Sequence, residues 1–218
     1  MSHVIESPTS HEIAAPAVIL QSERLHLGCF DRPVQGWTNT DVTPHLYVAR
    51  MPGLATLIWR MGKMTDARYE QHRRKLFRPI RYLNVAKRFP YPDNSFGAAY
   101  SSHLLEHLHP PDARRCLAEI LRTLKPGGVC RTVVPDLDIC VNGYDPKEPN
   151  VFLKKLFEPS ERQKNTHHWL YNADSLTALL LKIGFRKAYR CEYRQGLCPD
   201  LDILDNRREV SLYVEAIK

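Results

Sequence analysis

Two short histidine-rich runs carry the most reactive side chains of the sequence. The first spans Ser101–His107 and the second spans Asn165–Trp169. Histidine exchanges protons near neutral pH, and histidine and carboxylate side chains also bind metal ions. In the first run His103, Glu106 and His107 lie at the helical spacings i, i+3 and i+4. The runs therefore predict proton transfer or ligand binding.

Small and acidic residues stand where strands are expected to end. Arg24–Gly28 alternates apolar and polar residues and stops at Gly28, and Gly36–Val42 predicts a second strand that ends near Asp41. A glycine at such a corner lets a ligand approach the backbone, and ligands bind at strand ends in open α/β sheets. Gly28 and Asp41 are therefore candidate binding residues, although Asp41 could instead cap a turn.

The remaining periodic segments predict the elements that position these residues. Further strands are expected at 81–84, 96–100, 129–134, 189–193 and 209–216, and helices within 46–80, 113–124, 151–157 and 174–182. Strands that alternate with helices predict an α/β fold with a mostly parallel sheet and helices on both faces. The last two strands have no predicted helix between them, which indicates one antiparallel strand near one edge.

Composition limits the chain to one domain. It has 218 residues, of which 43% are apolar, enough for one hydrophobic core. We expect a flexible N-terminal tail at 1–22 and one domain at 23–218. No apolar run reaches the roughly 18 residues that span a bilayer, and the six cysteines are scattered. These features predict a cytoplasmic protein with reduced thiols and no membrane partner.

The net charge of +7 is concentrated in one segment. Between Arg60 and Arg88 there are ten basic and two acidic residues. Such a segment attracts an anionic partner or forms a solvated helix face. We therefore predict that the helical segment 46–80 is a basic insertion or lid.

Six motifs in order resemble one known family. They are Leu25–Cys29, Gly36–Asp41, Phe89–Phe96, Ser101–His107, Leu121–Gly128 and Val133–Asp136. Together they resemble class I S-adenosylmethionine-dependent methyltransferases of the methyltransferase type 11 group, in particular its small bacterial members. The resemblance covers residues 24 to 217 and implies a Rossmann-like α/β fold with a seven-stranded sheet.

The resemblance implies S-adenosylmethionine as the cofactor and S-adenosylhomocysteine as its product. Gly28 and Cys29 would contact the methionine part, Asp41 the ribose hydroxyls and Asn84 the adenine amino group. The full set of implied cofactor-binding residues is His26, Gly28, Cys29, Phe30, Asp41, Val42, Asn84, Val85, Ser101, Ser102 and His103.

Two positions depart from the family pattern. Phe30 stands where relatives commonly have a second glycine, and Asn84 where they usually have aspartate. These departures put the strength of cofactor binding in doubt. They motivate an alternative in which the fold is degenerate and serves as a non-catalytic binding or partner protein.

His103 is the first choice of catalytic base. Methyl transfer is an in-line displacement that depends on positioning and needs a base only when the acceptor is a hydroxyl or a protonated amine. His103 alternatively only packs on the cofactor. His107, His167 and His168 are further catalytic candidates, and the predicted acceptor-binding residues are His167, His168, Trp169 and Tyr171.

The first run also resembles a metal-binding pattern. Some RNA 3′-end and quinone-pathway O-methyltransferases carry Glu-x-x-Glu-His with a distal histidine, and here His103 replaces the first glutamate. In the wider family the Glu-His pair more often packs structurally, so no metal is assigned.

These features favour methyl transfer to an oxygen or nitrogen atom of a small molecule, such as a sugar or secondary metabolite in natural-product biosynthesis. The acceptor is expected to be anionic if the basic segment selects it. The alternative of an RNA methyltransferase fits the net charge of +7. It lacks support from the motifs, because Val133–Asp136 replaces the Asn/Asp-Pro-Pro-Tyr/Phe motif of many base N-methyltransferases. Nucleic acid is therefore an unlikely partner, and the oligomeric state is not predicted.

Overall fold

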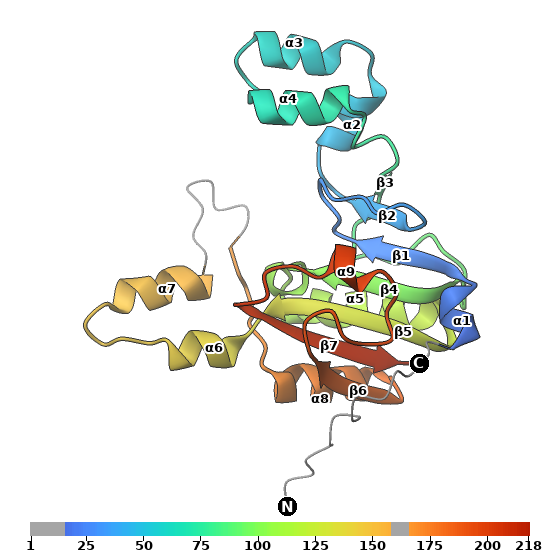
Figure 1. Ribbon diagram of the computed structural model, residues 1–218, viewed down its shortest axis with the longest axis vertical. Coiled ribbons are helices and arrows are strands. Elements are labelled where there is room, and N and C mark those ends of the chain that lie inside the picture. The colour runs from blue at the N-terminus through green and yellow to red at the C-terminus, as the bar shows by residue number, and fades with distance from the viewer. Residues whose placement is uncertain (1–15, 158–165) are drawn as a thin grey trace, which may run out of the picture.

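Seven strands form one continuous sheet in the described part of the chain (Figure 1). The computed structural model describes residues 16–157 and 166–218. The strands lie in the order β3-β2-β1-β4-β5-β7-β6. Their bounds are β1 Glu23–Leu27, β2 Thr38–Asp41, β3 Arg81–Tyr82, β4 Phe96–Ser102, β5 Leu124–Pro135, β6 Lys187–Cys191 and β7 Ser211–Ile217.

The strand directions follow from the connections. Neighbouring strands from β3 to β5 are all parallel, because each connection returns the chain to the same edge of the sheet. β7 is antiparallel to both β5 and β6. The predicted fold, a mostly parallel seven-stranded sheet with an antiparallel strand near one edge, is confirmed.

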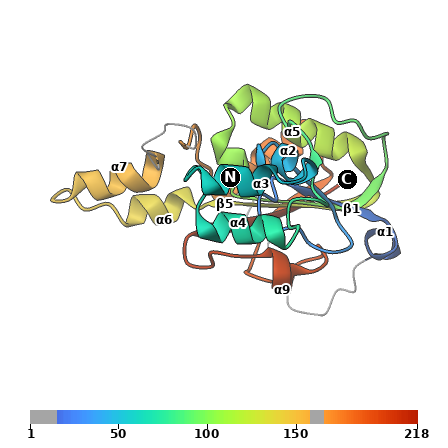
Figure 2. The same ribbon diagram turned by 90° about the horizontal axis from the view of Figure 1, so that it is seen from above.

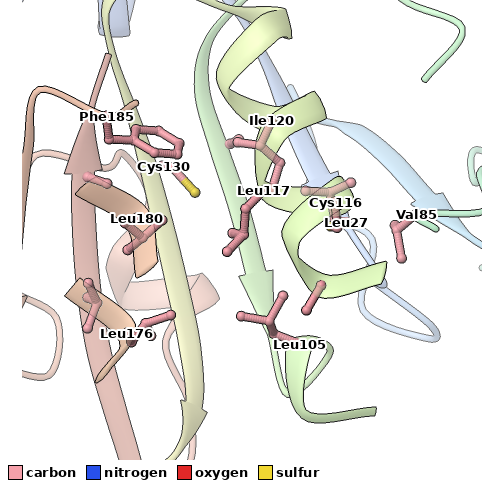
Figure 3. Close-up of a cluster of buried hydrophobic side chains, with 14 of the residues drawn as sticks. Leu27, Val85, Leu105, Cys116, Leu117, Ile120, Cys130, Leu176, Leu180 and Phe185 are labelled. Atoms are coloured by element: carbon pink, nitrogen blue, oxygen red, sulfur yellow. The ribbon is translucent and has the colours of Figure 1, made fainter. Parts of the chain in front are cut away.

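Helices α5 (Pro110–Thr123) and α8 (Ala173–Ile183) cover one face of the sheet. In α5, Cys116, Leu117 and Ile120 recur at helical spacing, so one stripe of the helix is buried against β4 and β5 (Figure 3). In α8, Leu176 and Leu180 lie one turn apart and bury their side chains in the same core. Each such leucine contributes roughly 1.5–3 kcal/mol by leaving water.

The opposite face is covered by two short helices, α1 (Ala17–Leu20) and α9 (Leu201–Leu204). Ile19 of α1 is fully buried, and a Cβ on Gly97 of β4 would collide with the Val18 carbonyl oxygen. The predicted flexible tail, residues 1–22, therefore extends too far along the chain, because residues 17–20 form α1 and pack on the sheet. Residues 1–15 lie outside the described residues.

A buried arginine holds the segment between β6 and β7. Arg131 of β5 contacts Asp205 through Nη2 at 2.5 Å and Glu215 through Nη1 at 3.2 Å, and all three side chains are fully buried. Removing one partner from a buried pair typically costs about 3–5 kcal/mol. The network links Glu192, Gln195 and Asp205 to β5, in a segment where the sequence predicts no helix and the structure forms the short α9.

Two groups of helices extend beyond the sheet (Figures 1 and 2). Helices α2 (His45–Arg50), α3 (Leu54–Arg60) and α4 (Asp66–Arg73) lie past β3, within the predicted helical segment 46–80. Helices α6 (Leu137–Asn142) and α7 (Pro149–Phe157) project beyond the far end of β5. The role of 46–80 as a lid stays a prediction.

Among the described residues, no helix is both long and apolar enough to cross a membrane. All six cysteines are free thiols.

Candidate functional site

A cleft of about 780 Å³ opens at the carboxyl ends of β1 and β4. Its walls are the loop after β1, the 3-10 turn η1 (Leu105–His107), and residues 203–207 in and after α9. Small-molecule sites usually have volumes of roughly 300–1,000 Å³. The cleft therefore suits a small organic ligand.

One end of the cleft, here the β1/β4 end, consists of Gly28, Cys29, Ser102 and His103. Gly28 has φ +65°, and a Cβ at this position would lie 3.0 Å from Leu104 Cδ1. Glycine is therefore required both by the backbone conformation and by the close approach of Leu104. Burial raises the pKa of the Cys29 thiol to about 12, so this sulfur is a neutral wall group rather than a nucleophile.

His26 lies beneath this end and joins β1 to β2. Its Nδ1 lies 3.1 Å from Asn39 Oδ1 and donates to that oxygen. Burial lowers the pKa of His26 to about 4, so the ring is neutral at physiological pH. His26 is thus a rigid neutral floor residue of the cleft.

His103 is held between two polar groups. Its Nε2 lies 3.1 Å from Ser211 Oγ at the start of β7. Its Nδ1 lies 3.3 Å from Glu106 Oε1, within ion-pair distance although the geometry is not that of a hydrogen bond. His103 also has φ +50°, an uncommon conformation for a residue with a side chain. The site thus positions an imidazole whose two nitrogens face different partners.

Four further candidate residues, Asp41, Val42, Asn84 and Val85, lie at or just after the ends of β2 and β3, here called the β2/β3 end of the site, and none of them lines the cleft. Asp41 Oδ2 accepts from Phe30 N at 3.0 Å, and Asp41 Oδ1 accepts from Thr43 N at 2.7 Å. Asn84 Oδ1 accepts from Ala86 N at 3.0 Å. The oxygens expected to bind ribose and adenine therefore already cap backbone turns.

The side chains of the two valines at this end also differ from expectation. Val85, one of the implied cofactor-binding residues, is 8% exposed and belongs to the core beneath α5 (Figure 3). Val42 is 53% exposed outside the cleft. Of the β4 residues, Ser101 is buried and does not line the cleft, whereas Ser102 does.

Phe30 links the cleft to the basic helices. It has φ +45°, and its ring contacts Phe77 and carries the Arg68 guanidinium 4.5 Å from its centroid. Arg68 also pairs with Asp31 at 3.1 Å, so α4 packs against the loop after β1. Where the family commonly has glycine, this chain uses an aromatic residue to anchor the helices of 46–80.

The predicted acceptor-binding residues separate into two groups. His167 is buried, and its ring lies beside that of the cleft-lining His107, with ring centroids 5.1 Å apart and the ring planes tilted by 53°. His168 instead stacks on His109 outside the cleft, and Trp169 is 52% exposed.

Tyr171, also predicted to bind the acceptor, is 3% exposed and packs in the core. Its backbone forms an isolated parallel β-bridge with Asp136.

Several lining residues were not predicted. They are Asp31, Arg32, Pro33, Val34, Tyr100, Glu106, Ile203, Leu204, Asn206 and Arg207. Tyr100 could have been found because it is near the end of β4. The residues of 203–207 could not, because long-range contacts such as the Arg131–Asp205 pair and the Tyr100–Leu204 hydrogen bond bring that segment to the cleft.

Comparison with known proteins was made by sequence and by structure. A family model described as a methyltransferase domain matches residues 60–132. A probable methyltransferase, ltbC of Aspergillus luteorubrus, is 40% identical over 50 residues, which is 22% of this chain. The match spans only 18% of the length of that curated relative.

Solved structures share the fold at low identity. A methyltransferase from Thermotoga maritima, a possible histamine N-methyltransferase, has a TM-score of 0.51 and 16% identity over 90% of this chain and 82% of its own. One from Methanosarcina mazei has a TM-score of 0.51 and 16% identity over 94% and 99%. At this identity the likeness concerns the fold alone.

The strand order, the cleft at the ends of β1 and β4 and the family match agree. The family model matches residues 60–132, and the solved structures named above, which are S-adenosylmethionine-dependent methyltransferases, share the fold of this chain.

Proposed function

We propose that this chain transfers the methyl group of S-adenosylmethionine to an oxygen or nitrogen atom of a small-molecule acceptor. The observation that carries the proposal is one cleft that joins Gly28 and Cys29 at the end of β1 to His103 at the end of β4. When bound, S-adenosylmethionine supplies a methyl group already activated by its sulfonium charge. The protein then has to hold, orient and deprotonate the acceptor.

The residues present fit this cofactor at the β1/β4 end. Gly28 lines the cleft with a half-buried backbone that carries no side chain. The neutral walls formed by His26 and Cys29 suit an uncharged stretch of ligand. Gly28, Cys29 and Ser102 would therefore contact the methionine part.

His103 is the proposed base. If Nδ1 carries the proton toward Glu106, Nε2 has the free lone pair and can take a proton from an acceptor hydroxyl. That acceptor would replace Ser211 as the partner of Nε2.

The opposite wall supports a small polar acceptor. Ile203 and Leu204 supply apolar surface, Asn206 donates to Ser102 Oγ at 3.2 Å, and Arg32 and Arg207 add positive charge. These residues favour an anionic or hydroxylated acceptor. Sugars and secondary metabolites are therefore the first acceptors to screen.

One observation favours a second function, a binding protein without catalysis. Both Asp41 oxygens already accept backbone N–H groups, and Phe30 occupies a position where glycine is common in the family. A weakened adenosine site would lower cofactor affinity and leave a scaffold for a partner.

Isothermal titration of the purified chain with S-adenosylmethionine and S-adenosylhomocysteine separates the two functions. Saturable binding of both at micromolar concentrations, followed by label transfer to an acceptor from the screen, supports the enzyme. A folded protein that binds neither compound, alone or with the acceptor collection, contradicts it and favours the binding protein.

A further inference from the structure

Three potential metal ligands meet beside the cleft. Glu106, His107 and His167 each offer one ligand atom, and these atoms all lie within 4.8 Å of one another. Glu106 and His107 belong to η1, whereas His167 comes from the segment before α8. The fold therefore assembles the cluster from two distant parts of the chain.

The Glu106 carboxylate supplies an independent indication of a ligand. Its side chain is fully buried, and neither oxygen has a hydrogen-bond partner in the described part of the chain. Its Oε1 lies 3.3 Å from His103 Nδ1. Buried carboxylates are normally paired with hydrogen bonds or bound to metal. Since a carboxylate has two oxygens, one can face His103 while the other binds a cation.

The backbone holds the two parts of the cluster together. The Glu106 carbonyl accepts from His168 N at 2.7 Å and from Trp169 N at 3.2 Å. These two bonds fasten the segment that carries His167 onto η1. The scaffold therefore brings the two parts of the cluster together before any ion binds.

The two histidines are oriented as metal ligands usually are. His107 Nδ1 lies 3.2 Å from the Thr166 carbonyl, and His167 Nδ1 lies 3.2 Å from the Leu156 carbonyl. Because a carbonyl only accepts, each Nδ1 donates to its carbonyl, which makes Nε2 the ring nitrogen assigned to the metal in the proposed site. A backbone carbonyl on the other ring nitrogen is the common support of a metal-bound histidine.

We propose that Glu106, His107 and His167 bind a divalent metal ion of the zinc class. Two imidazoles and one carboxylate are a common zinc donor set, with a fourth position left for water or substrate. Ligands at about 2.0 Å from zinc lie about 3.3 Å apart, so the cluster has to contract by about 1.5 Å. Glu106 and His107 also line the cleft, so the fourth position faces it.

The metal site would add a binding position for the acceptor of the proposed methyl transfer, and this role of the site rests on the proposed function. An acceptor with an oxygen donor, such as a hydroxyl or carboxylate, would bind at the fourth position next to His103. The metal site itself does not depend on methyl transfer. It is therefore tested without cofactor or acceptor.

Zn²⁺ alone is titrated into the chelator-treated full chain against a chromophoric competitor. We expect one equivalent to bind, and Glu106→Gln, His107→Gln and His167→Gln each to weaken binding by roughly 100-fold, at or above the 10–100-fold loss known for outer-shell partners. His109→Gln is the matched control, because His109 stacks on His168 outside the cluster. Its affinity should equal that of the wild type.

Co²⁺ provides a second readout on the wild-type chain. Visible d–d bands of a four-coordinate ion that Zn²⁺ displaces would support the site even if a variant failed to fold. The proposal is overturned by a wild-type chain that binds no stoichiometric Zn²⁺ or Co²⁺, or by folded ligand variants that bind as tightly as the control. Titration of the metal-free chain with S-adenosylhomocysteine tests the proposed function separately.

Discussion

The two ends of the site are built from the same kind of strand terminus, yet they differ in how much of their polar surface remains for a ligand. At the β1/β4 end, Gly28 exposes backbone and His103 extends into the cleft. At the β2/β3 end, Asp41 and Asn84 use their oxygens on nearby backbone N–H groups.

The difference shows that a residue can stand at a ligand-binding position of the family while its polar atoms already bind the backbone. Asp41 stands at the end of β2, as the family pattern requires, but the turns at Phe30 and Thr43 take up its carboxylate. Cofactor binding at this end must share those oxygens. Each has a second lone pair, so sharing is chemically possible.

The largest effect is expected from His103, at the β1/β4 end. His103→Ala should lower the methyl-transfer rate by about 10²–10⁴-fold, because that is the usual contribution of a positioned base. Binding of S-adenosylhomocysteine, measured by titration, should change little. His109→Ala is the control. A rate within tenfold of wild type would mean that His103 is not the base and only packs on the cofactor.

The second largest effect concerns His26, which joins the two ends through Asn39. Burial keeps the pKa of folded His26 at about 4, while the unfolded ring titrates near 6.5. The unfolded state binds more protons between these values, so the free energy of unfolding falls as pH drops from 6.5 to 4. The loss from this residue is about 3 kcal/mol.

Urea denaturation of wild type and His26→Gln across this pH range isolates the effect of His26. His45, whose pKa is also lowered to about 4 by burial, contributes equally to both proteins. The variant should therefore show the shallower pH dependence. Parallel curves would mean that His26 is not buried as described.

The fold was predictable because its signals are local and redundant. Cys116, Leu117 and Ile120 give the helical period of α5, and all three are buried as that period requires. The antiparallel β7 followed from two consecutive strands. The packed Ile19 was missed because Pro16 and the polar residues around it resemble a tail.

The candidate site was predictable only at strand ends. Gly28, Ser102 and His103 follow directly from β1 and β4, so their location depends on register alone. The Asn206 side of the cleft depends on long-range contacts such as the buried Arg131–Asp205 pair, and Tyr171 packs in the core rather than at the cleft. Such long-range contacts leave no periodic signal in a single sequence.

Substitution of Gly28 tests whether the β1/β4 end binds the cofactor. Gly28→Ala should weaken S-adenosylhomocysteine binding by about 100-fold, because the new Cβ meets Leu104 and the positive φ costs roughly 1–2 kcal/mol. Gly36→Ala is the matched control. Gly36 has φ +80° with nothing within 4 Å of a Cβ, so the Gly36→Ala variant has the backbone strain without a steric clash. Equal affinities of the two variants, measured by titration, would remove Gly28 from the site.

The smallest effects compare the two polar residues of the β2/β3 end. Asp41→Asn replaces one acceptor oxygen by an amide donor, so either Phe30 N or Thr43 N loses its partner. We expect the free energy of unfolding to fall by about 1–2 kcal/mol and cofactor affinity to fall with it. Asn84→Asp keeps the oxygen that accepts from Ala86 N and should change stability by less than about 0.5 kcal/mol.

Urea denaturation and titration of both variants decide whether this end contacts the cofactor. If Asp41→Asn lowers stability but leaves affinity intact, Asp41 is a turn cap, and the β1/β4 end alone holds the ligand. If Asn84→Asp changes affinity while stability stays constant, the amide faces adenine after all. The two residues would then share their oxygens between backbone and cofactor, and the contrast between the two ends would be one of degree.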